Sequence, residues 1–564
     1  MRRRALLLSL TISAVLLTVV PASSSPALHR TTPLDKLEPA LLSQGARLWL
    51  TGSPLQPGEH RAQTRARFGT NVNANDPSRD LAGGQSETAI AAGGHRVLAA
   101  WNDISGALVQ PTTSRRASVT GVGVSANGGR SFTDLIGLPN NNPNQQWFGD
   151  PTVVAVDNGR AFIIGSLYFP NSNPASINCA RPARFNLAVS VARVAPNGRV
   201  TFTNPIVAVP GGNSCDLERP TPPPSLALLD KEWLSYDPAS RTLAMSYTRF
   251  FLPGAHSGTG QIELVRARVP ANPAALSSAA FSRPVIIRPE EPTVANTGAY
   301  VATAPGGTAY VAWERNIDTN LGVSGDPYVY IHAAAVGPEA IVPVTDRPTG
   351  PRILTRIVTK GQANSSPAGG VRSLDGAIIS GYNRGPGQDF PRIAVDARRR
   401  AVIVVWNDAS LHPLGDVFLR AFSLTLDHPS RIQKVNDDNS YALHFMPAVS
   451  VRADGSIVSS WYDRRRSGAN SATTDYMGEI RHSPTSPGRD FRISTGPDRL
   501  DQGLKPHHPE LRRLHRQRLE RHQDLVHLVR RPTGCTTAVR RRPLALELTD
   551  FADTAGLPRR TETA

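Results

Sequence analysis

The chain has 564 residues, of which 48 are proline and 46 are glycine, and its formal net charge at pH 7 is +17. This content of turn-forming residues favours many short strands over a helical protein. Three cysteines exclude a disulfide-rich scaffold, and a single long apolar run excludes a bundle of membrane spans.

The N-terminal apolar run predicts a secretory signal peptide over residues 1–22. Arg2, Arg3 and Arg4 precede apolar residues that continue to Val20, and small residues follow. The alternative is one membrane anchor, for which the run is short. We therefore expect a secreted, extracellular protein without a stable membrane span. In that oxidising compartment Cys179 and Cys215 are candidates for a disulfide, with Cys535 left over.

Residues 23–83 are rich in Pro, Ser and Arg without periodicity and predict an extended lead-in. Part of the positive charge lies in the signal peptide and in residues 498–564, so the body of the chain is only mildly basic. It shows no basic stripe with interleaved aromatic residues, so we expect no nucleic-acid partner. A mild basic bias suits an acidic glycan or an anionic cell surface, or simply a solvated surface.

Residues 84–497 repeat one pattern six times. Each copy has a short strand, a turn, a second strand rich in Val, Ile and Ala, and usually an aromatic residue followed by a polar one. The copies pair residues 87–91 with 97–103, 150–157 with 161–168, 230–237 with 243–247, 300–304 with 309–315, 389–396 with 401–408, and 445–451 with 457–464. Such regular recurrence indicates a repeat architecture.

A hairpin of this length cannot bury a core alone, so neighbouring copies must pack on each other. A ring of four-stranded blades satisfies this and leaves only short strand edges. The alternative, a pair of β-sandwiches, accommodates six similar copies poorly. The sequence therefore predicts an all-β protein, a monomeric β-propeller. We expect six blades, with the last copy sharing strands with the first. A ring of seven blades is the alternative.

The segment Ser125-Ala126-Asn127-Gly128-Gly129-Arg130-Ser131-Phe132 matches the Asp-box pattern Ser-x-Asp-x-Gly-x-x-Trp/Phe, with Asn127 in the Asp place. The third residue of such a box caps a hairpin turn through its own backbone. A degraded second copy is Gly488-Arg489-Asp490-Phe491. Together with the strand pairs that end in Trp-Asn-Asp or Trp-Tyr-Asp-Arg, this resembles the sialidase-like (BNR/Asp-box repeat) superfamily of secreted bacterial propellers, over about residues 71–497.

The resemblance implies a glycan or cell-surface carbohydrate as partner, and it implies possible glycoside hydrolysis of the exo-α-sialidase type. A sialidase grips the substrate carboxylate with three arginines, and it uses a Tyr nucleophile activated by a Glu and an Asp that transfers the proton. In the family the first arginine usually lies in Arg-Ile-Pro or Arg-Leu-Pro before the first Asp box. This sequence contains neither tripeptide.

Candidate site residues follow from the repeats, because equivalent places in a propeller converge on one ring near the axis. The catalytic candidates are Asp150, Asp230, Glu232, Asp389 and Tyr462, with Glu87 close by in the pattern, and the substrate-binding candidates are Arg315, Arg392 and Arg464. The alternative is structural: the acids cap strand starts and pair with the arginines, as in a non-catalytic binding or scaffold propeller. The scattered histidines show no metal-ligand spacing, and we expect no metal and no cofactor.

From about residue 498 the pattern stops and a basic, His-rich tail follows. Its run from Leu511 to His522 is typical of a basic amphipathic helix, which would suit a polyanion-binding tail. A second hypothesis is a change of reading frame near Pro497. Permissible codons for His522–Arg531, read one base later, give Thr-Lys-Thr-Trp-Phe-Thr-Trp-Ser-Asp-Gly, the blade-ending pattern found upstream. Those for His508–His515 give Thr-Pro-Asn-Phe-Gly-Asp-Tyr.

Overall fold

The computed structural model describes most of the predicted repeat region. The described residues are 71–76, 78, 85–103, 118–140, 145–170, 184–212, 227–251, 260–291, 294–316, 328–338, 353–362, 390–408, 410–412, 415–440, 442–466, 473–496 and 498–499. Several predicted features lie wholly or mostly outside them: the signal peptide, the extended lead-in up to residue 70, the Cys179–Cys215 pair, Asp389 and the basic tail after residue 499.

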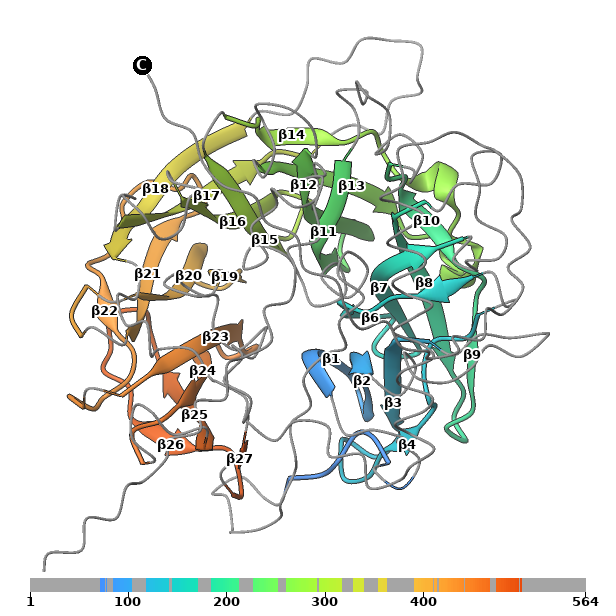
Figure 1. The fold of residues 1–564 in the computed structure, drawn as a ribbon, viewed down its shortest axis with the longest axis horizontal. Coiled ribbons are helices and arrows are strands. Elements are labelled where there is room, and N and C mark those ends of the chain that lie inside the picture. Colours follow the sequence, from blue (N-terminus) through green and yellow to red (C-terminus); the bar gives the residue numbers. More distant parts are fainter. Residues whose placement is uncertain are drawn as a thin grey trace, which may run out of the picture.

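The described residues form six antiparallel sheets, which Figure 1 shows as a ring around a common centre. Blade 1 contains β1 (Gln85–Gly93), β2 (Arg96–Asp103), β3 (Thr120–Ser125) and β4 (Thr133–Asp134). Blade 2 contains β5 (Gln146–Trp147), β6 (Thr152–Val156), β7 (Ala161–Phe169), β8 (Asn186–Val194), β9 (Val200–Phe202) and β10 (Ile206–Val209). Blade 3 contains β11 (Ala227–Asp237), β12 (Thr242–Phe251), β13 (Gly260–Arg268) and β14 (Val285–Arg288).

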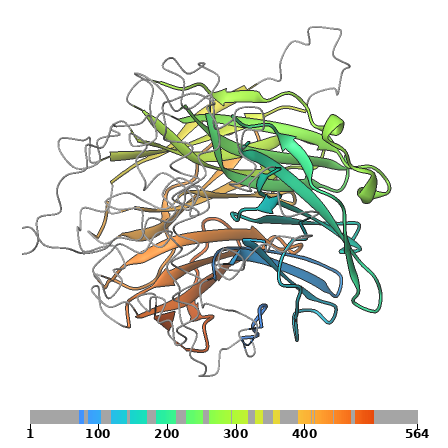
Figure 2. The same ribbon diagram turned by 45° about the vertical axis from the view of Figure 1, so that its right-hand side comes forward.

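The other three blades repeat this order. Blade 4 contains β15 (Ala295–Thr303), β16 (Ala309–Asn316), β17 (Tyr328–Val336) and β18 (Ile353–Gln362). Blade 5 contains β19 (Arg392–Asp396), β20 (Ala401–Asp408), β21 (Asp416–Ser423) and β22 (Gln433–Lys434). Blade 6 contains β23 (His444–Val451), β24 (Ile457–Asp463), β25 (Thr473–Arg481), β26 (Asp490–Arg492) and β27 (Asp498–Arg499). Two 3₁₀ helices, Pro273–Ala275 and Ser278–Ala280, lie at the periphery (Figure 2).

This arrangement confirms the predicted all-β propeller with six blades. In each copy the two predicted strands pair with each other, as the first and second strands of the sheet or, in blade 2, as β6 and β7. One expectation is wrong for the described residues: the last copy does not share strands with the first, because every blade comes from one continuous stretch of chain.

The core lies between the blades. Alternate residues of each strand face opposite sides of its sheet, so the sheets of blades 2–5 each bury one apolar face against the blade before and one against the blade after. Trp313 contributes to the cluster between blades 3 and 4, Trp406 to that between blades 4 and 5, and Trp461 to that between blades 5 and 6. These tryptophans are therefore part of the core between blades.

The turn at Ser125–Phe132 is closed by the side chains that the sequence singles out. The Asn127 Oδ1 accepts a hydrogen bond from the Ser131 backbone N–H at 3.0 Å, and the Ser125 Oγ accepts one from the Gly129 N–H at 2.9 Å. Gly128 and Gly129 have φ of 76° and 83°, a conformation that glycine adopts without steric cost.

Candidate functional site

Irregularities at the start of the inner strands aim side chains toward the propeller axis. The pairing of β1, β11, β15 and β23 each shifts register at one point, and a residue with left-handed backbone lies at each shift. These residues are Glu87 (φ 48°), Lys231 (φ 58°), Gly298 (φ 67°) and Met446 (φ 50°). A bulge of this kind turns the strand locally and redirects a side chain.

Blade 2 has the same feature just before β6, where Asp150 has φ 57°. Non-glycine residues adopt this conformation at a cost in free energy, and they concentrate at functional sites. Equivalent bulge positions in blades 1, 2 and 3 therefore carry Glu87, Asp150 and Lys231. The sequence suggests that Asp150 and Asp230 are equivalent, but the register makes Lys231 the counterpart of Asp150, with Asp230 one position earlier.

These three bulge residues meet at one end of the ring. The Lys231 Nζ lies 3.7 Å from the Glu87 Oε1 and 3.9 Å from the Asp150 Oδ2. The Asn102 side chain lies beside both acids: its Nδ2 donates to the Asp150 Oδ1 at 3.1 Å and to the Glu87 Oε2 at 3.4 Å, and its Oδ1 accepts from the Asp150 backbone N–H at 2.5 Å. Two carboxyl groups thus share one lysine and one amide.

Asp150 is buried and its pKa lies well above the ordinary value. Burial is the largest cause, because a low-dielectric surrounding disfavours the charged carboxylate. The negative charge of Glu87 and a hydrogen bond with it raise the pKa further, and the Lys231 charge only partly opposes them. These causes together favour the protonated form of the Asp150 carboxyl group.

Glu232 is a second buried acid, and it has fewer partners. It is 4% exposed, and neither carboxyl oxygen has a hydrogen-bond partner on another described residue. Burial is the largest cause of a pKa well above the ordinary value; a hydrogen bond with its own backbone and the Lys231 charge oppose it, and the charges of Asp230 and Glu87 add to it. Burial of an ionised carboxylate is costly, so the surroundings favour the neutral form. We define Glu87, Asn102, Asp150, Asp230, Lys231 and Glu232 as the axial cluster.

The opposite side of the axial end is apolar. The Lys231 Nζ lies 5.6 Å from the centre of the Phe390 ring. Gly298 lies under the same ring, since a Cβ added to it would be 2.1 Å from a Phe390 ring carbon. The bulge position of blade 4 must therefore be glycine, both for its φ and for this close approach.

Of the predicted site residues, the structure brings together Asp150, Asp230 and Glu232. Asn102 and Lys231 are absent from the predicted set. Asn102 could have been found from its place directly after Trp101 at the end of a repeat. Lys231 could not have been found from the sequence, because only the register shift in β11 identifies the bulge position.

The predicted arginines and tyrosine lie in blades 4–6 and have partners there. The Arg315 Nη2 donates to the Glu291 Oε2 at 2.9 Å. The Arg392 guanidinium lies 3.6 Å from the centre of the Tyr300 ring. The Arg464 guanidinium is buried 5.7 Å from the Phe445 ring centre, and Tyr462 stacks on that same ring at 5.2 Å. The charges that shift the pKa of Asp150 and Glu232 come instead from Glu87, Asp230 and Lys231.

A tyrosine–glutamate pair does occur in blade 3. The Tyr247 hydroxyl and the Glu263 carboxylate form a short hydrogen bond, and Arg249 and Gln261 also donate to Glu263. Tyr247 is fully buried, and its pKa is raised by burial and by the Glu263 charge. The raised pKa favours the protonated hydroxyl, which donates a hydrogen bond to the Glu263 carboxylate. A hydroxyl beside a carboxylate base is also the arrangement of a base-activated nucleophile.

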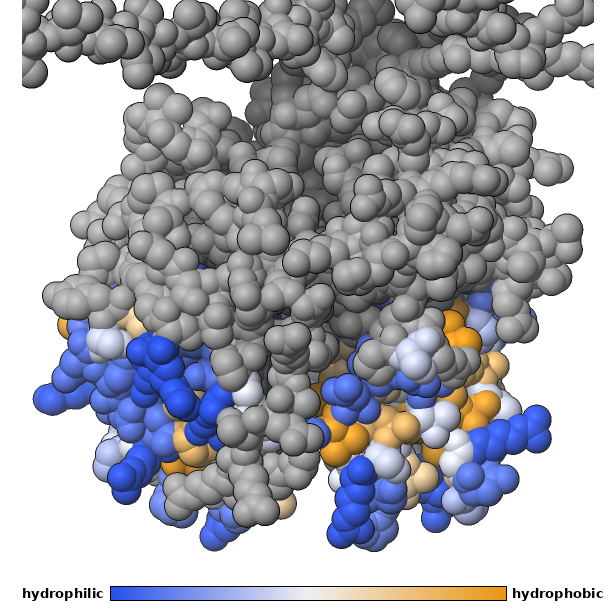
Figure 3. Space-filling model, turned by 60° about the horizontal axis from the view of Figure 1, so that its bottom comes forward, coloured by the Kyte–Doolittle hydropathy of each residue, from blue (hydrophilic) through white to orange (hydrophobic). Residues whose placement is uncertain are grey.

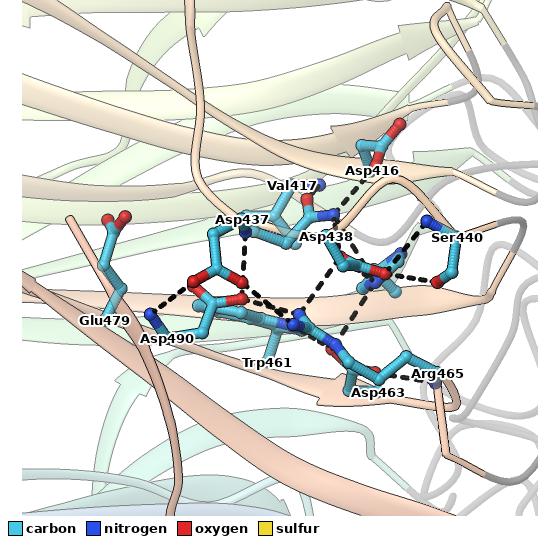
Figure 4. A network of polar contacts seen from close by, with 12 residues as sticks. Asp416, Val417, Asp437, Asp438, Ser440, Trp461, Asp463, Arg465, Glu479 and Asp490 are labelled. Atoms are coloured by element: carbon cyan, nitrogen blue, oxygen red, sulfur yellow. Dashed lines mark hydrogen bonds and ion pairs between the residues drawn. The ribbon is translucent and has the colours of Figure 1, made fainter. Parts of the chain in front are cut away.

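A second buried polar cluster joins blades 5 and 6 (Figure 4). The His444 ring lies between carboxylates: its Nε2 is 3.2 Å from the Asp438 Oδ1 and 3.4 Å from the Asp463 Oδ2, and its Nδ1 is 2.9 Å from the Gly415 carbonyl oxygen. Arg465 reaches Asp438, Asp463 and Asp490 at 3.2, 2.8 and 2.6 Å. We define His444, Arg465 and these three aspartates as the blade 5–6 cluster.

Both ring nitrogens of His444 face acceptors, so the imidazolium form is favoured. Burial opposes the charge, but the bond to Asp438 and the charges of Asp463 and Asp438 outweigh it and raise the pKa of His444. The pKa of Asp438 is lowered: burial opposes this, but bonds from His444, Asn436 and Ser440 prevail. Each charge in this pair therefore has a matched partner inside the fold.

In the part of the chain that the structure describes, no helix is long and apolar enough to cross a membrane, and no group of His, Cys, Asp and Glu could hold a metal ion.

Comparison with known proteins gives structural matches only. No protein-family model and no curated protein sequence matches the chain. The solved structures that are similar include the α-L-arabinanase of Penicillium chrysogenum (TM-score 0.37, 10% identity, 80% of this chain and 99% of that one). They also include the α-L-arabinofuranosidase Arb93A of Fusarium graminearum (0.38, 11%, 79% and 98%) and Trypanosoma rangeli sialidase (0.35, 11%, 78% and 60%). TM-scores this low carry no functional information, so a functional proposal depends on this chain's own side chains.

Proposed function

We propose that this protein is a secreted propeller whose axial cluster binds a neutral glycan and hydrolyses a glycosidic bond. The observation that carries the proposal is the pair of buried acids, Asp150 and Glu232, whose pKa values burial raises, beside a third carboxyl group, Glu87. Glycoside hydrolysis requires one carboxyl group that donates a proton to the leaving oxygen and a second that acts as base or nucleophile. A general acid needs a raised pKa, which burial and neighbouring charges supply here.

The composition of the cluster favours a neutral sugar. Sugar hydroxyls donate hydrogen bonds, and carboxylate and amide oxygens accept them. One lysine among four acids offers little to a substrate carboxylate, which a set of arginines would bind bidentately. The arginines expected for that purpose are engaged in blades 4–6. We therefore favour neutral glycans over the sialic acids that the resemblance implies.

The alternative is a non-catalytic scaffold in which the acids are structural. It is favoured by the Lys231 contacts to Glu87 and Asp150, which tie blades 1, 2 and 3 together. It does not account for Glu232, because a structural acid would have hydrogen-bond partners for its oxygens.

The test is hydrolysis and binding with a panel of neutral and sialylated oligosaccharides. We expect release of reducing sugar from a neutral member, and we expect Glu232→Gln and Asp150→Asn each to lower the rate about 10²–10⁴-fold. Asp490→Asn is the matched control, since Asp490 is also a half-buried acid with a pKa raised by burial, to about 7, but lies in blade 6. Activity unchanged in both axial variants would contradict the assignment. Binding without hydrolysis by the unsubstituted protein would support the scaffold alternative.

A further inference from the structure

The ring of described blades is not closed. Five hydrophobic clusters hold the six blades together, and each one joins consecutive blades: 1 with 2, 2 with 3, 3 with 4, 4 with 5, and 5 with 6. Neighbouring inner strands contact each other from β1 through β6, β11, β15 and β19 to β23, whereas β23 and β1 share no comparable contact. Figure 1 shows the same break, between the sheets of blade 6 and blade 1.

The first strand of blade 1 faces this break with a side chain whose counterparts in blades 2–5 are buried and whose counterpart in blade 6, Val449, is partly buried. Ile90 occupies the position after the bulge that is filled by Val153, Leu234, Val301 and Ile393 in blades 2–5. Those four are 2–8% exposed and pack against the preceding blade, but Ile90 is 67% exposed. The apolar face of β1 is therefore built for a neighbour.

Blade 6 presents the other side of the break. The side chains of Tyr476, Ile480 and Ile493 remain half-buried there. A short N-terminal segment, residues 71–76, spans the distance: the Asn71 side chain bonds the Ile493 carbonyl and the Thr495 N–H, and the Asp76 N–H donates to Asp134 of blade 1. Figure 3, seen from this side, shows the described residues as two lobes with exposed apolar side chains.

The chain leaves blade 6 in the direction that would start another blade. After β22 of blade 5, the Val435 N–H bonds the Val417 carbonyl near the start of β21, and the chain then enters β23. After β26, the Ile493 N–H bonds the Tyr476 carbonyl, and β27 pairs with Thr473 and Thr474 at the start of β25. More residues follow Arg499 than make up the whole of blade 1.

In the present frame these residues lack the strand pattern, but the alternative frame restores it without interruption. Permissible codons for residues 508–531, read one base later, give Thr-Pro-Asn-Phe-Gly-Asp-Tyr-Ile-Ala-Ser-Gly-Trp-Ser-Val-Thr-Lys-Thr-Trp-Phe-Thr-Trp-Ser-Asp-Gly. Phe-Gly-Asp is identical to Phe148-Gly149-Asp150, which places an aspartate at a bulge position. The separation from this Asp to the last Trp also fits the separations from Glu87 to Trp101 and from Met446 to Trp461.

We propose that the break between blades 6 and 1 is the place of a seventh blade, encoded by the DNA for residues 508–531 when it is read one base later. This blade covers Ile90 and closes the ring. Its Phe-Gly-Asp segment adds a carboxyl group at the axis, beside Glu87. That catalytic consequence rests on the proposed function, whereas the blade itself does not.

The coding DNA tests the proposal first, because the alternative frame requires particular codons. The codons for Leu525 and Leu528 must both end in TG. The codon for Leu511 must be CTT, and those for Arg513 and Arg530 must each be CGA or AGA. We expect these codons in the gene. Between codons 498 and 508 we also expect one extra base, either inserted in the recorded sequence or present in the gene as a frameshift. Any other codon at Leu525, Leu528, Arg513 or Arg530 removes the Trp or the Asp of the pattern and overturns the proposal.

A second test compares the full chain of 564 residues with the chain produced when one base is deleted ahead of codon 508. Each carries Ile90→Cys, and modification by a soluble maleimide is located by peptide mapping. We expect modification to become at least about tenfold slower in the frame-restored chain, as Ile90 becomes buried. Ile286→Cys in β14, where the native side chain is 50% exposed, is the matched control and should react equally in both.

Equal reactivity of Ile90→Cys in the two chains, with the control also unchanged, would overturn the seventh-blade position. This readout involves no glycan, so its failure is distinct from failure of the proposed function. An increase in Tm of the frame-restored chain should accompany the protection, because closing the ring buries apolar surface on both blade 1 and blade 6.

Discussion

The axial cluster and the blade 5–6 cluster both bury several carboxyl groups, but the two clusters differ in the hydrogen-bond and ion-pair partners of those groups. Asp438 and Asp463 each receive hydrogen bonds or ion pairs from several donors, among them His444 and Arg465. Neither oxygen of Glu232 has a hydrogen-bond partner on another described residue, and Asp150 shares one lysine with Glu87. The first arrangement joins two blades, and in the second burial raises the pKa of Asp150 and of Glu232.

The difference follows from position. The blade 5–6 cluster forms where Asp438, on the segment that links the two blades, and His444, at the start of β23, meet Asp463 and Arg465 at the end of β24, so the fold itself can supply the partners. The axial cluster depends on bulges, which take residues out of the regular ladder and point them at the centre of the ring. The acids there are buried close to one another with a single lysine among them, and buried acids with raised pKa values are a common property of active sites.

The largest expected effect is on the blade 5–6 cluster. His444→Ala should lower the free energy of unfolding by about 3–5 kcal/mol at pH 6, because it removes one of the two cations that pair with the buried carboxylates of Asp438 and Asp463 and leaves only Arg465. Denaturant unfolding measures this. A loss below about 1 kcal/mol would mean that the cluster contributes little to joining the blades.

Gly298→Ala probes the apolar side of the axial end. The added Cβ meets the Phe390 ring and must adopt φ near 67°, so we expect a loss of about 2–3 kcal/mol. Gly306→Ala is the control that measures only the cost of placing alanine at positive φ. Gly306 also has positive φ, but a Cβ added there meets nothing within 4 Å. Equal losses in the two variants would show that Phe390 does not pack on Gly298.

The pH dependence of stability separates the contribution of the His444 imidazolium from that of the Asp438 carboxylate. The pKa of His444 is raised above 6.5, so its contribution is complete below pH 6.5 and is lost as pH rises through the raised pKa of the folded state. The pKa of Asp438 is lowered from 3.8, so its contribution is present above that value and is lost as pH falls. The difference in unfolding free energy between the unsubstituted protein and His444→Gln should therefore be greatest between about pH 4 and 6.5. A difference that grows above pH 8 would contradict the imidazolium assignment.

The smallest expected effect is that of Glu232→Gln on stability. Because burial keeps the Glu232 carboxyl neutral, an amide of the same shape should change the unfolding free energy by less than about 1 kcal/mol at pH 5. At pH 9 the variant should be the more stable protein, since a raised pKa means that the acid's contribution is lost as pH rises. Thermal unfolding at the two pH values measures this, and a strong loss at pH 5 would assign Glu232 a structural role.

The repeats themselves were predictable from the sequence. Alternating apolar residues, turn signals and the recurring Trp-Asn-Asp and Trp-Tyr-Asp-Arg endings determine six strand pairs, and each pair is found in one blade. The third-position Asn127 caps its turn as the pattern predicts. These features are local, so a single copy of the repeat already contains the information.

Membership of the axial cluster was predictable only in part. Asp150, Asp230 and Glu232 are acids at repeat starts, and the sequence identifies them. Lys231 depends on a register shift between β11 and β12, and Asn102 depends on blade 2 lying directly against blade 1. The arginines at similar repeat positions bind Glu291 or lie over the rings of Tyr300 and Phe445 instead.

By itself the sequence determined the strand period, the number of described blades and the candidate acids, because each of these depends on residues close together in the chain. Only the tertiary structure decided which acids are protonated and which are paired, since burial and the charges of other blades shift each pKa. It also decided that Ile90 stays uncovered while its counterparts in blades 2–5 are buried. That depends on the contact between the first and last blades, which a repeat pattern alone does not specify.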